Sequence, residues 1–189
     1  MDYKCALREE TARLVTDYLE YCCRREGVQE LPAPTPAAAT LRLVSSELRQ
    51  IYQDFFECAL NQLLDREPEQ VIVNVAELMD RGEFNWGRVA VLVVFAGALL
   101  EMEELLKEEQ VLQLRRETSR RLTEKLCNYL VERKGAWLHE NGGWTGFHHH
   151  FEKRQSPPPS DSSNNTLCCI MAAAAGFGLV GLALLLVVR

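Results

Sequence analysis

The strongest constraint on the fold is an uninterrupted apolar run in the middle of the chain, residues 89–100. Its 12 residues carry no charge and are flanked by Arg88 and Glu101. As a helix the run is too short to cross a bilayer, and it is apolar on every side, so it predicts a helix buried at the centre of a domain. A buried β-strand is the alternative for such valine-rich sequence, but the helix-favouring run 101–109 that follows favours the helix.

Apolar residues also recur at three- and four-residue steps through most of the remaining chain, the period of amphipathic helices. Helices are predicted over about 6–25, from Leu41 to Phe55, from Pro68 to near Gly82 and over about 111–133, with two short pieces around Gly142 and Gly143. The apolar stripes comprise Leu7, Thr11, Leu14, Val15, Tyr18 and Cys22; Leu41, Val44, Leu48, Ile51 and Phe55; Val71, Val75 and Leu78; and Leu122, Leu126, Tyr129 and Leu130. Neither strand alternation nor an internal repeat occurs in the sequence, so the predicted fold class is all-α.

A second apolar run, residues 167–188, is followed only by Arg189. Its 22 uncharged residues would reach about 33 Å as a helix, enough to cross a hydrocarbon core of about 30 Å. The N-terminus has no apolar run of the signal-peptide kind. We therefore expect a C-terminal transmembrane tail anchor over 167–188, a flexible stalk over 155–166, and a helical domain over 1–154 on the cytosolic side. Cys168 and Cys169, at the membrane boundary, are either acylated or simply small apolar residues.

The composition excludes several classes of function. The chain has a net charge of −6 and no basic block, which predicts no nucleic-acid partner. Its seven cysteines contain no C-x-x-C pair, so reduced thiols are expected in a cytosolic domain. No nucleophile-elbow, zinc-protease or phosphate-loop motif occurs, so we expect neither an enzyme nor a cofactor. Three consecutive histidines, His148, His149 and His150, suggest metal, but adjacent helical residues point about 100° apart, which favours a structural role and no metal site.

A polar motif, Phe84-Asn-Trp-Gly-Arg, stands immediately before the central apolar run. Asn85 is a good helix N-cap, and Gly87, which lacks a Cβ, would let another chain approach the start of the helix. Arg88 offers a planar fork of donors that suits a carboxylate. A second motif, Trp137-Leu-His-Glu-Asn-Gly-Gly-Trp144, breaks a helix at its glycine pair. The three tryptophans, Trp86, Trp137 and Trp144, are predicted to be core aromatics.

These motifs resemble those of the Bcl-2 family of apoptosis regulators. Residues 77–100, with Asn-Trp-Gly-Arg and the later Phe95-Ala-Gly-Ala-Leu, look like Bcl-2 homology motif 1, and residues 137–151 look like motif 2. Residues 9–23 are similar to motif 4, and residues 37–56 contain a degenerate motif 3. The short linker over 27–36 and the tail beginning at Met171 look most like the Bcl-2-like-10 group of that family.

The resemblance implies a bundle of about eight helices around a central hydrophobic hairpin, here 85–105 and 111–133. It also implies a surface groove that receives an amphipathic death-motif helix from a pro-apoptotic relative. An apolar trough with one charged contact is what such a ligand requires. Carried over position by position, the polar end of the groove would be Asn85, Gly87 and Arg88, and its apolar lining Leu48, Tyr52, Leu78, Val91 and Phe95. Leu78 fits the pattern less well because one extra residue stands between it and Asn85.

Two departures from the family pattern bear on function. Ser45-Ser46 stands where motif 3 usually has Gly-Asp, and Thr145 stands where Asp often follows the motif 2 tryptophan. Without the motif 3 aspartate, the chain is predicted to receive death-motif helices as a pro-survival protein and not to donate one. The alternatives are a pro-apoptotic member of the same family, or an endoplasmic-reticulum scaffold that regulates a calcium channel through its first helix. The tail fits either the mitochondrial outer membrane or the endoplasmic reticulum.

Overall fold

The computed structural model describes residues 3–23, 31–61, 63, 66–102 and 109–155, and within these ranges all regular structure is helical. No helix in this part of the chain is sufficiently long and apolar to cross a membrane. The predicted stalk, apart from its first residue, and the predicted anchor lie outside the described residues. In chain order the helices are α1 (Tyr3–Cys22), α2 (Pro36–Ile51), α3 (Gln53–Asn61), α4 (Pro68–Met79), α5 (Trp86–Met102), α6 (Glu109–Cys127), the π-helical η2 (Asn128–Arg133), α7 (Gly135–Glu140) and α8 (Gly143–Gln155).

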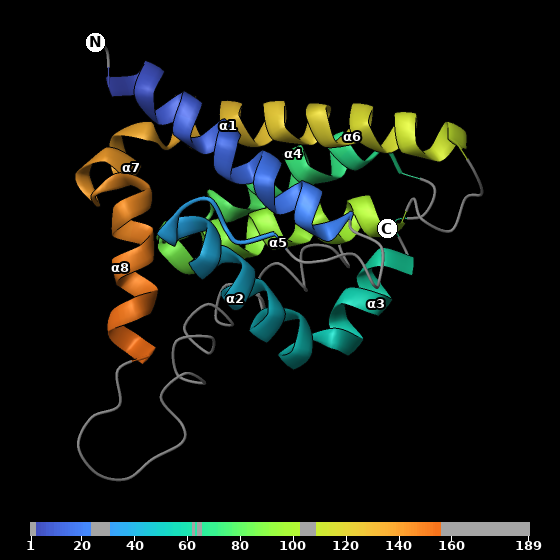
Figure 1. Ribbon diagram of the computed structural model, residues 1–189, viewed down its shortest axis with the longest axis horizontal. Helices are drawn as coiled ribbons and strands as arrows, with labels where there is room; N and C mark the ends of the chain where they lie inside the picture. The colour runs from blue at the N-terminus through green and yellow to red at the C-terminus, as the bar shows by residue number, and fades with distance from the viewer. Residues whose placement is uncertain (1–2, 24–30, 62, 64–65, 103–108, 156–189) are drawn as a thin grey trace, which may run out of the picture.

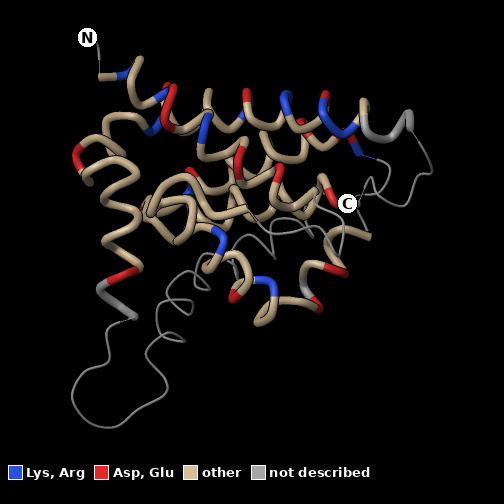
Figure 2. The backbone as a smooth tube through the Cα atoms, viewed as in Figure 1, with Lys and Arg blue, Asp and Glu red and all other residues tan. Residues whose placement is uncertain are grey.

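Helix α5 is the centre of the bundle, as the apolar run predicts. Every residue from 89 to 100 is buried, on all sides of the helix. Helices α1, α2, α3, α4 and α6 all contact α5. Figure 1 shows α5 in the middle of the molecule, with α1 and α6 side by side across one face and α2 and α3 across the opposite side. Charged residues lie mainly on the surrounding helices, while α5 is uncharged between its two ends (Figure 2).

The amphipathic stripes also face the core largely as predicted. The apolar positions of α1 from Leu7 to Tyr18 are buried, and Cys22 is half-buried. On α6 and η2, Leu122, Leu126 and Leu130 are inaccessible to solvent. The predicted continuous α-helix over 111–133 widens into a π-helical turn after Cys127, where the Lys134 amide donates to the Tyr129 carbonyl at 3.1 Å. Tyr129, Leu130 and Val131 are all buried in this wider turn.

The prediction of one helix from Leu41 to Phe55 is wrong. Helix α2 ends at Ile51, because Tyr52 adopts φ −113° and ψ 28°, and the chain restarts as α3 at Gln53. The break takes Ile51 out of the apolar stripe, and 43% of its surface is exposed. The core contact that follows is made by Phe56, whose ring lies 6.2 Å from the ring of Phe95 on α5. The side chain of Phe55 lies outside the described residues.

Helices α1 and α5 approach closely at Gly97. A Cβ placed there would lie 2.7 Å from Sγ of Cys22 and 2.8 Å from Cε1 of Tyr18, both on α1. Tyr18 is 1% exposed and belongs to the core, so its ring has little room to withdraw. Glycine at this position is therefore a packing requirement of the α1–α5 interface.

We predict that Gly97→Ala destabilises the protein by about 1–3 kcal/mol, the usual cost of overpacking a core. The matched control is Gly135→Ala at the start of α7, where an added Cβ would meet Leu7 at an ordinary 3.8 Å. The measurement is the urea midpoint followed by circular dichroism. Equal midpoints for the two variants would contradict the tight α1–α5 contact.

Candidate functional site

The candidate site begins at the N-terminus of α5, where the Asn-Trp-Gly-Arg motif lies. Asn85 precedes the first helical residue, and its Oδ1 accepts a hydrogen bond from the backbone amide of Arg88 at 3.0 Å. The prediction of an N-cap at Asn85 is therefore confirmed. Asn85 itself is exposed, whereas Trp86 and Gly87 are buried. The cap fixes where α5 starts, and with it the direction in which Arg88 leaves the helix.

Arg88 does not project from the surface as a free cation. Its side chain is buried at 9% exposure and donates from Nη1 to the backbone carbonyl of Met79, the last residue of α4. The guanidinium also lies against Gly82, where a Cβ would come within 2.5 Å of Nη2. An arginine that donates to a terminal carbonyl satisfies one of the acceptors left open at a helix C-terminus. In this structure Arg88 thus ties the end of α4 to the start of α5.

A polar cluster around Asp80 lies next to this contact. The Asp80 carboxylate accepts from the Tyr129 hydroxyl at 2.9 Å and forms ion pairs with Arg133 and, at 2.7 Å, with Lys134. Partial burial opposes ionisation of Asp80, but the hydrogen bonds from Lys134 and Tyr129 outweigh it and lower the pKa of the carboxyl. Burial, and then the hydrogen bond to Asp80, raise the pKa of Tyr129. Tyr129 therefore remains a hydrogen-bond donor at neutral pH.

Aromatic side chains from three segments meet beneath the N-terminus of α5. The ring of Trp86 lies 4.9 Å from that of Trp137 and 5.6 Å from that of Phe147, both in edge-to-face contact. Trp144 is 1% exposed, and its indole Nε1 donates to Oγ1 of Thr11 at 2.9 Å. Trp86 and Trp144 are thus core aromatics as predicted, and Trp137 is partly buried against the same core. The Thr11 bond joins the predicted motif 4 on α1 to the predicted motif 2 on α8.

The glycines of motif 2 have two separate structural roles. Gly142 and Gly143 adopt φ values of 82° and 59°, the left-handed region that favours glycine, and separate α7 from α8. A Cβ on Gly146 would lie only 1.8 Å from the Asn141 carbonyl oxygen. Together they form the sharp bend that brings the rings of Trp137 and Trp144 to within 4.9 and 6.3 Å of the ring of Trp86.

Of the predicted apolar lining of a groove, Leu48, Val91 and Phe95 belong to the core and Tyr52 packs against it, whereas Leu78 is not part of this cluster. Leu48, Val91 and Phe95 are 1–2% exposed, whereas Tyr52 and Leu78 are half-buried. Met79, not Leu78, is the buried residue at the end of α4. Two surface hollows described in the structure lie elsewhere, one of about 820 Å³ along α1 and Pro34, the other of about 530 Å³ over Leu31 and Leu43. The predicted groove role of these residues is not tested by these positions and stays a prediction.

Sequence reasoning missed two ion pairs that join α2 to its neighbours. Arg42 is buried and contacts Asp17 of α1 at 2.8 Å, and it also donates to the Leu31 carbonyl. Arg49 pairs with Glu101 at the end of α5 at 2.5 Å. The available signal was a row of polar residues along one side of α2, since Arg42 and Arg49 are seven residues apart and share a face.

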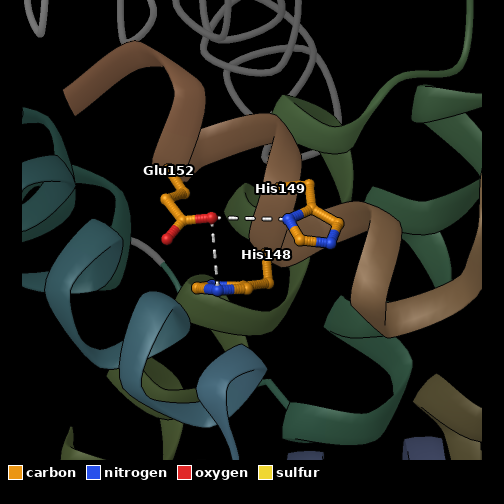
Figure 3. A group of neighbouring side chains, drawn as sticks. All are labelled: His148, His149 and Glu152. Carbon is orange, nitrogen blue, oxygen red and sulfur yellow. Dashed lines mark hydrogen bonds and ion pairs between the residues drawn. The ribbon is translucent and has the colours of Figure 1, made fainter. Parts of the chain in front are cut away.

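Two histidines of the triple-histidine segment meet one carboxylate (Figure 3). Nε2 of His148 lies 3.6 Å, and Nδ1 of His149 lies 3.4 Å, from Oε2 of Glu152. The three ligand atoms lie within 4.8 Å of one another. The argument that adjacent helical histidines diverge too far to share an ion is therefore wrong for this pair, because both rings turn toward the next helical turn.

Comparison with known proteins places the chain in a family. The family model described as apoptosis regulator proteins of the Bcl-2 family matches residues 41–144. Anti-apoptotic protein NR13 of Gallus gallus is 42% identical over 187 residues, covering 97% of this chain and 98% of that protein. The chain belongs to the Bcl-2 family. Bcl-2-like protein 10 of Homo sapiens is 39% identical over 154 residues, covering 75% of this chain and 74% of that one.

The Bcl-2 fold agrees with a solved structure of similar sequence. The zebrafish pro-survival protein NRZ, in its complex with Bad BH3, superposes with a TM-score of 0.63 at 34% sequence identity. The superposition covers 78% of this chain and 96% of the zebrafish chain. The all-helical Bcl-2 bundle expected from the motifs is confirmed for the described residues.

We predict that the Asp80 cluster makes stability depend on pH at the acidic end. Because the pKa of Asp80 is lowered in the folded protein, its stabilisation is present above the ordinary aspartate range and is lost as the pH falls through the folded pKa. Asp80→Asn should cost about 1–2 kcal/mol at neutral pH, since the cluster is partly exposed, and progressively less in acid. The measurement is the unfolding free energy of both proteins across the acidic range.

Tyr129→Phe provides the companion variant, since it removes only the hydroxyl donor to Asp80. It should lose a smaller part of the stability with the same pH dependence. A constant difference between Asp80→Asn and the unaltered protein at all pH values would contradict the assignment.

Proposed function

We propose that this chain is a non-enzymatic pro-survival protein that holds death-motif helices of pro-apoptotic relatives in a groove over α5. The observation that carries the proposal is the zebrafish pro-survival relative, which is solved in complex with Bad BH3 and shares the fold at 34% identity. The NR13 relatives, which match 97% of this chain, are named anti-apoptotic proteins, and this supports a pro-survival role. The Asn-Trp-Gly-Arg motif at the start of α5 supplies the polar end that such a groove needs.

The groove would open by displacement of α3. This helix has only 9 residues, follows the break at Tyr52, and has α2 and α5 as its main neighbours. It covers the face of α5 through the contact of Phe56 with Phe95, and Figure 1 shows it at the edge of the bundle. Short elements with few partners open at low free-energy cost. Movement of α3 would uncover Phe95 for an apolar anchor of a ligand helix.

Arg88 would fix the register of the ligand. Its present acceptor is the neutral carbonyl of Met79, and a ligand aspartate would replace it with a charge-assisted bond of roughly twice the strength. The neighbouring N-terminus of α5 also favours negative charge. The chain's own motif 3 carries exposed Ser46 where the family's ligands have aspartate, which supports a receiving role.

We predict an energetic coupling between Arg88 and the aspartate of the ligand helix. In a double-mutant cycle, Arg88→Ala is combined with an Asp→Ala change in a Bad BH3 peptide, and all four dissociation constants are measured by titration calorimetry. A coupling of about 1.5–3 kcal/mol is expected, the range of a hydrogen bond to a charged group. The cycle cancels any loss of folding stability caused by removing the contact of Arg88 with Met79.

Arg133→Ala is the matched control, since Arg133 lies in the neighbouring Asp80 cluster and is 54% exposed. It should show little coupling to the peptide aspartate. Coupling at Arg133 instead of Arg88, or at neither, would refute the proposed polar end of the groove.

Gly87→Glu should abolish binding, because it places bulk and negative charge at the same end.

We further propose that residues 167–188 anchor the protein on the cytosolic face of the mitochondrial outer membrane or the endoplasmic reticulum. Deleting residues 167–189 should release the protein from membranes in a flotation assay and leave peptide affinity unchanged. Replacing 167–188 with an unrelated apolar segment of equal length should restore membrane association. If the deleted form still floats with membranes, the anchor lies elsewhere.

A further inference from the structure

The surface of α8 carries three potential metal ligands that the peptide-binding groove does not use. His149 and Glu152 are each 56% exposed at the side chain, and His148 is 24% exposed, so the group opens to solvent. Figure 3 shows both imidazole rings turned toward the Glu152 carboxylate from the preceding turn. One oxygen, Oε2, is shared by both contacts.

Two of the three distances match the edges of a tetrahedral site. Zinc binds histidine nitrogen and carboxylate oxygen at about 2.0–2.2 Å, which places neighbouring ligand atoms in a tetrahedron about 3.3–3.6 Å apart. The two contacts to Oε2 measure 3.4 and 3.6 Å, and all three ligand atoms fit within 4.8 Å. The third distance, between the ligand nitrogens of His148 and His149, lies within 4.8 Å. Rotation of one imidazole side chain is therefore enough to bring both nitrogens to bonding distance of one ion.

His148 is already oriented for ligation. Its Nδ1 lies 2.7 Å from Oγ1 of Thr40 on α2, and Thr40 is buried at 8% exposure. In the tautomer whose Nδ1–H donates to this hydroxyl, the lone pair of Nε2 faces Glu152. Metal-binding histidines usually donate their other ring N–H to an oxygen acceptor, which fixes the ring and raises its basicity, and the Thr40 hydroxyl takes that place here.

We propose that His148 Nε2, His149 Nδ1 and Glu152 Oε2 form a Zn²⁺ site with an open fourth position. Two imidazoles and one carboxylate are a donor set suited to zinc, whereas magnesium and calcium take oxygen ligands. Through Thr40 the ion is coupled to α2, which packs directly against α8. Zinc therefore strengthens the α2–α8 interface, and water or a ligand from a partner completes its coordination. The zinc site uses none of the groove residues, so it does not depend on the proposed peptide binding.

The test titrates the full-length chain in detergent with ZnCl₂ by calorimetry, and separately with Co²⁺ by visible absorption. One equivalent of zinc is expected to bind and to raise the thermal midpoint. Bound Co²⁺ should show d–d bands without the thiolate charge-transfer absorption that cysteine ligation would produce. Strong thiolate absorption at the first equivalent would overturn the proposal, since it would assign the metal to the cysteines.

Variants locate the site. His149→Ala and Glu152→Gln change exposed ligands and should weaken zinc binding by about 100-fold or more, while Thr40→Val, which acts through His148, should weaken it about tenfold. His150→Gln is the matched control on the same helix, where the ring packs 5.0 Å from that of Phe151, and it should bind zinc as the unaltered chain does. Circular dichroism of each variant without metal checks folding. Equal affinity in all variants, or no saturable binding, would overturn the proposal.

Discussion

The burial of α5 on every side is the constraint on which the rest of the structure depends. A helix without a polar face cannot lie at the surface of a domain, so its whole circumference must be covered by other elements. Residues 89–100 are covered by five amphipathic helices, each of which contributes one apolar face. The close approach of α1 at Gly97 and the ring contact from Phe56 of α3 belong to this covering. The covering of α5 thus defines the core of the domain.

The polar N-terminus of α5 connects the family's sequence motifs into one unit. Asn85 sets the start of the helix, and Arg88 reaches back to the last carbonyl of α4. Trp86 packs between Trp137 and Phe147, and the indole of Trp144 donates to Thr11 on α1. The segments predicted as motifs 1, 2 and 4 are therefore held together by direct contacts.

Stability and binding make opposite demands on the same surface. Val91 and Phe95, the α5 side chains proposed to hold a ligand helix, are only 2% and 1% exposed in this structure. In the proposed binding mode the short helix α3 reconciles the two demands, because it loses few contacts if a longer amphipathic ligand helix takes its place. Arg88 donates to the neutral carbonyl of Met79 in this structure, and in the proposed binding mode a ligand carboxylate would take the place of that acceptor.

The sequence by itself determined the helical class and the central position of residues 89–100, because these follow from local periodicity and from total apolarity. It predicted the cap at Asn85 from the capping preference of asparagine, and the burial of Trp86 and Trp144. It also predicted most of the core positions of α1, α6 and η2, which lie on regular stripes. Only the tertiary structure decided the break at Tyr52, the contact of Arg88 with Met79, the pairing of Arg42 with Asp17 and the meeting of His148 and His149 at Glu152. Those features depend on side-chain rotamers and on how separate helices pack, which residue spacing along one chain does not specify.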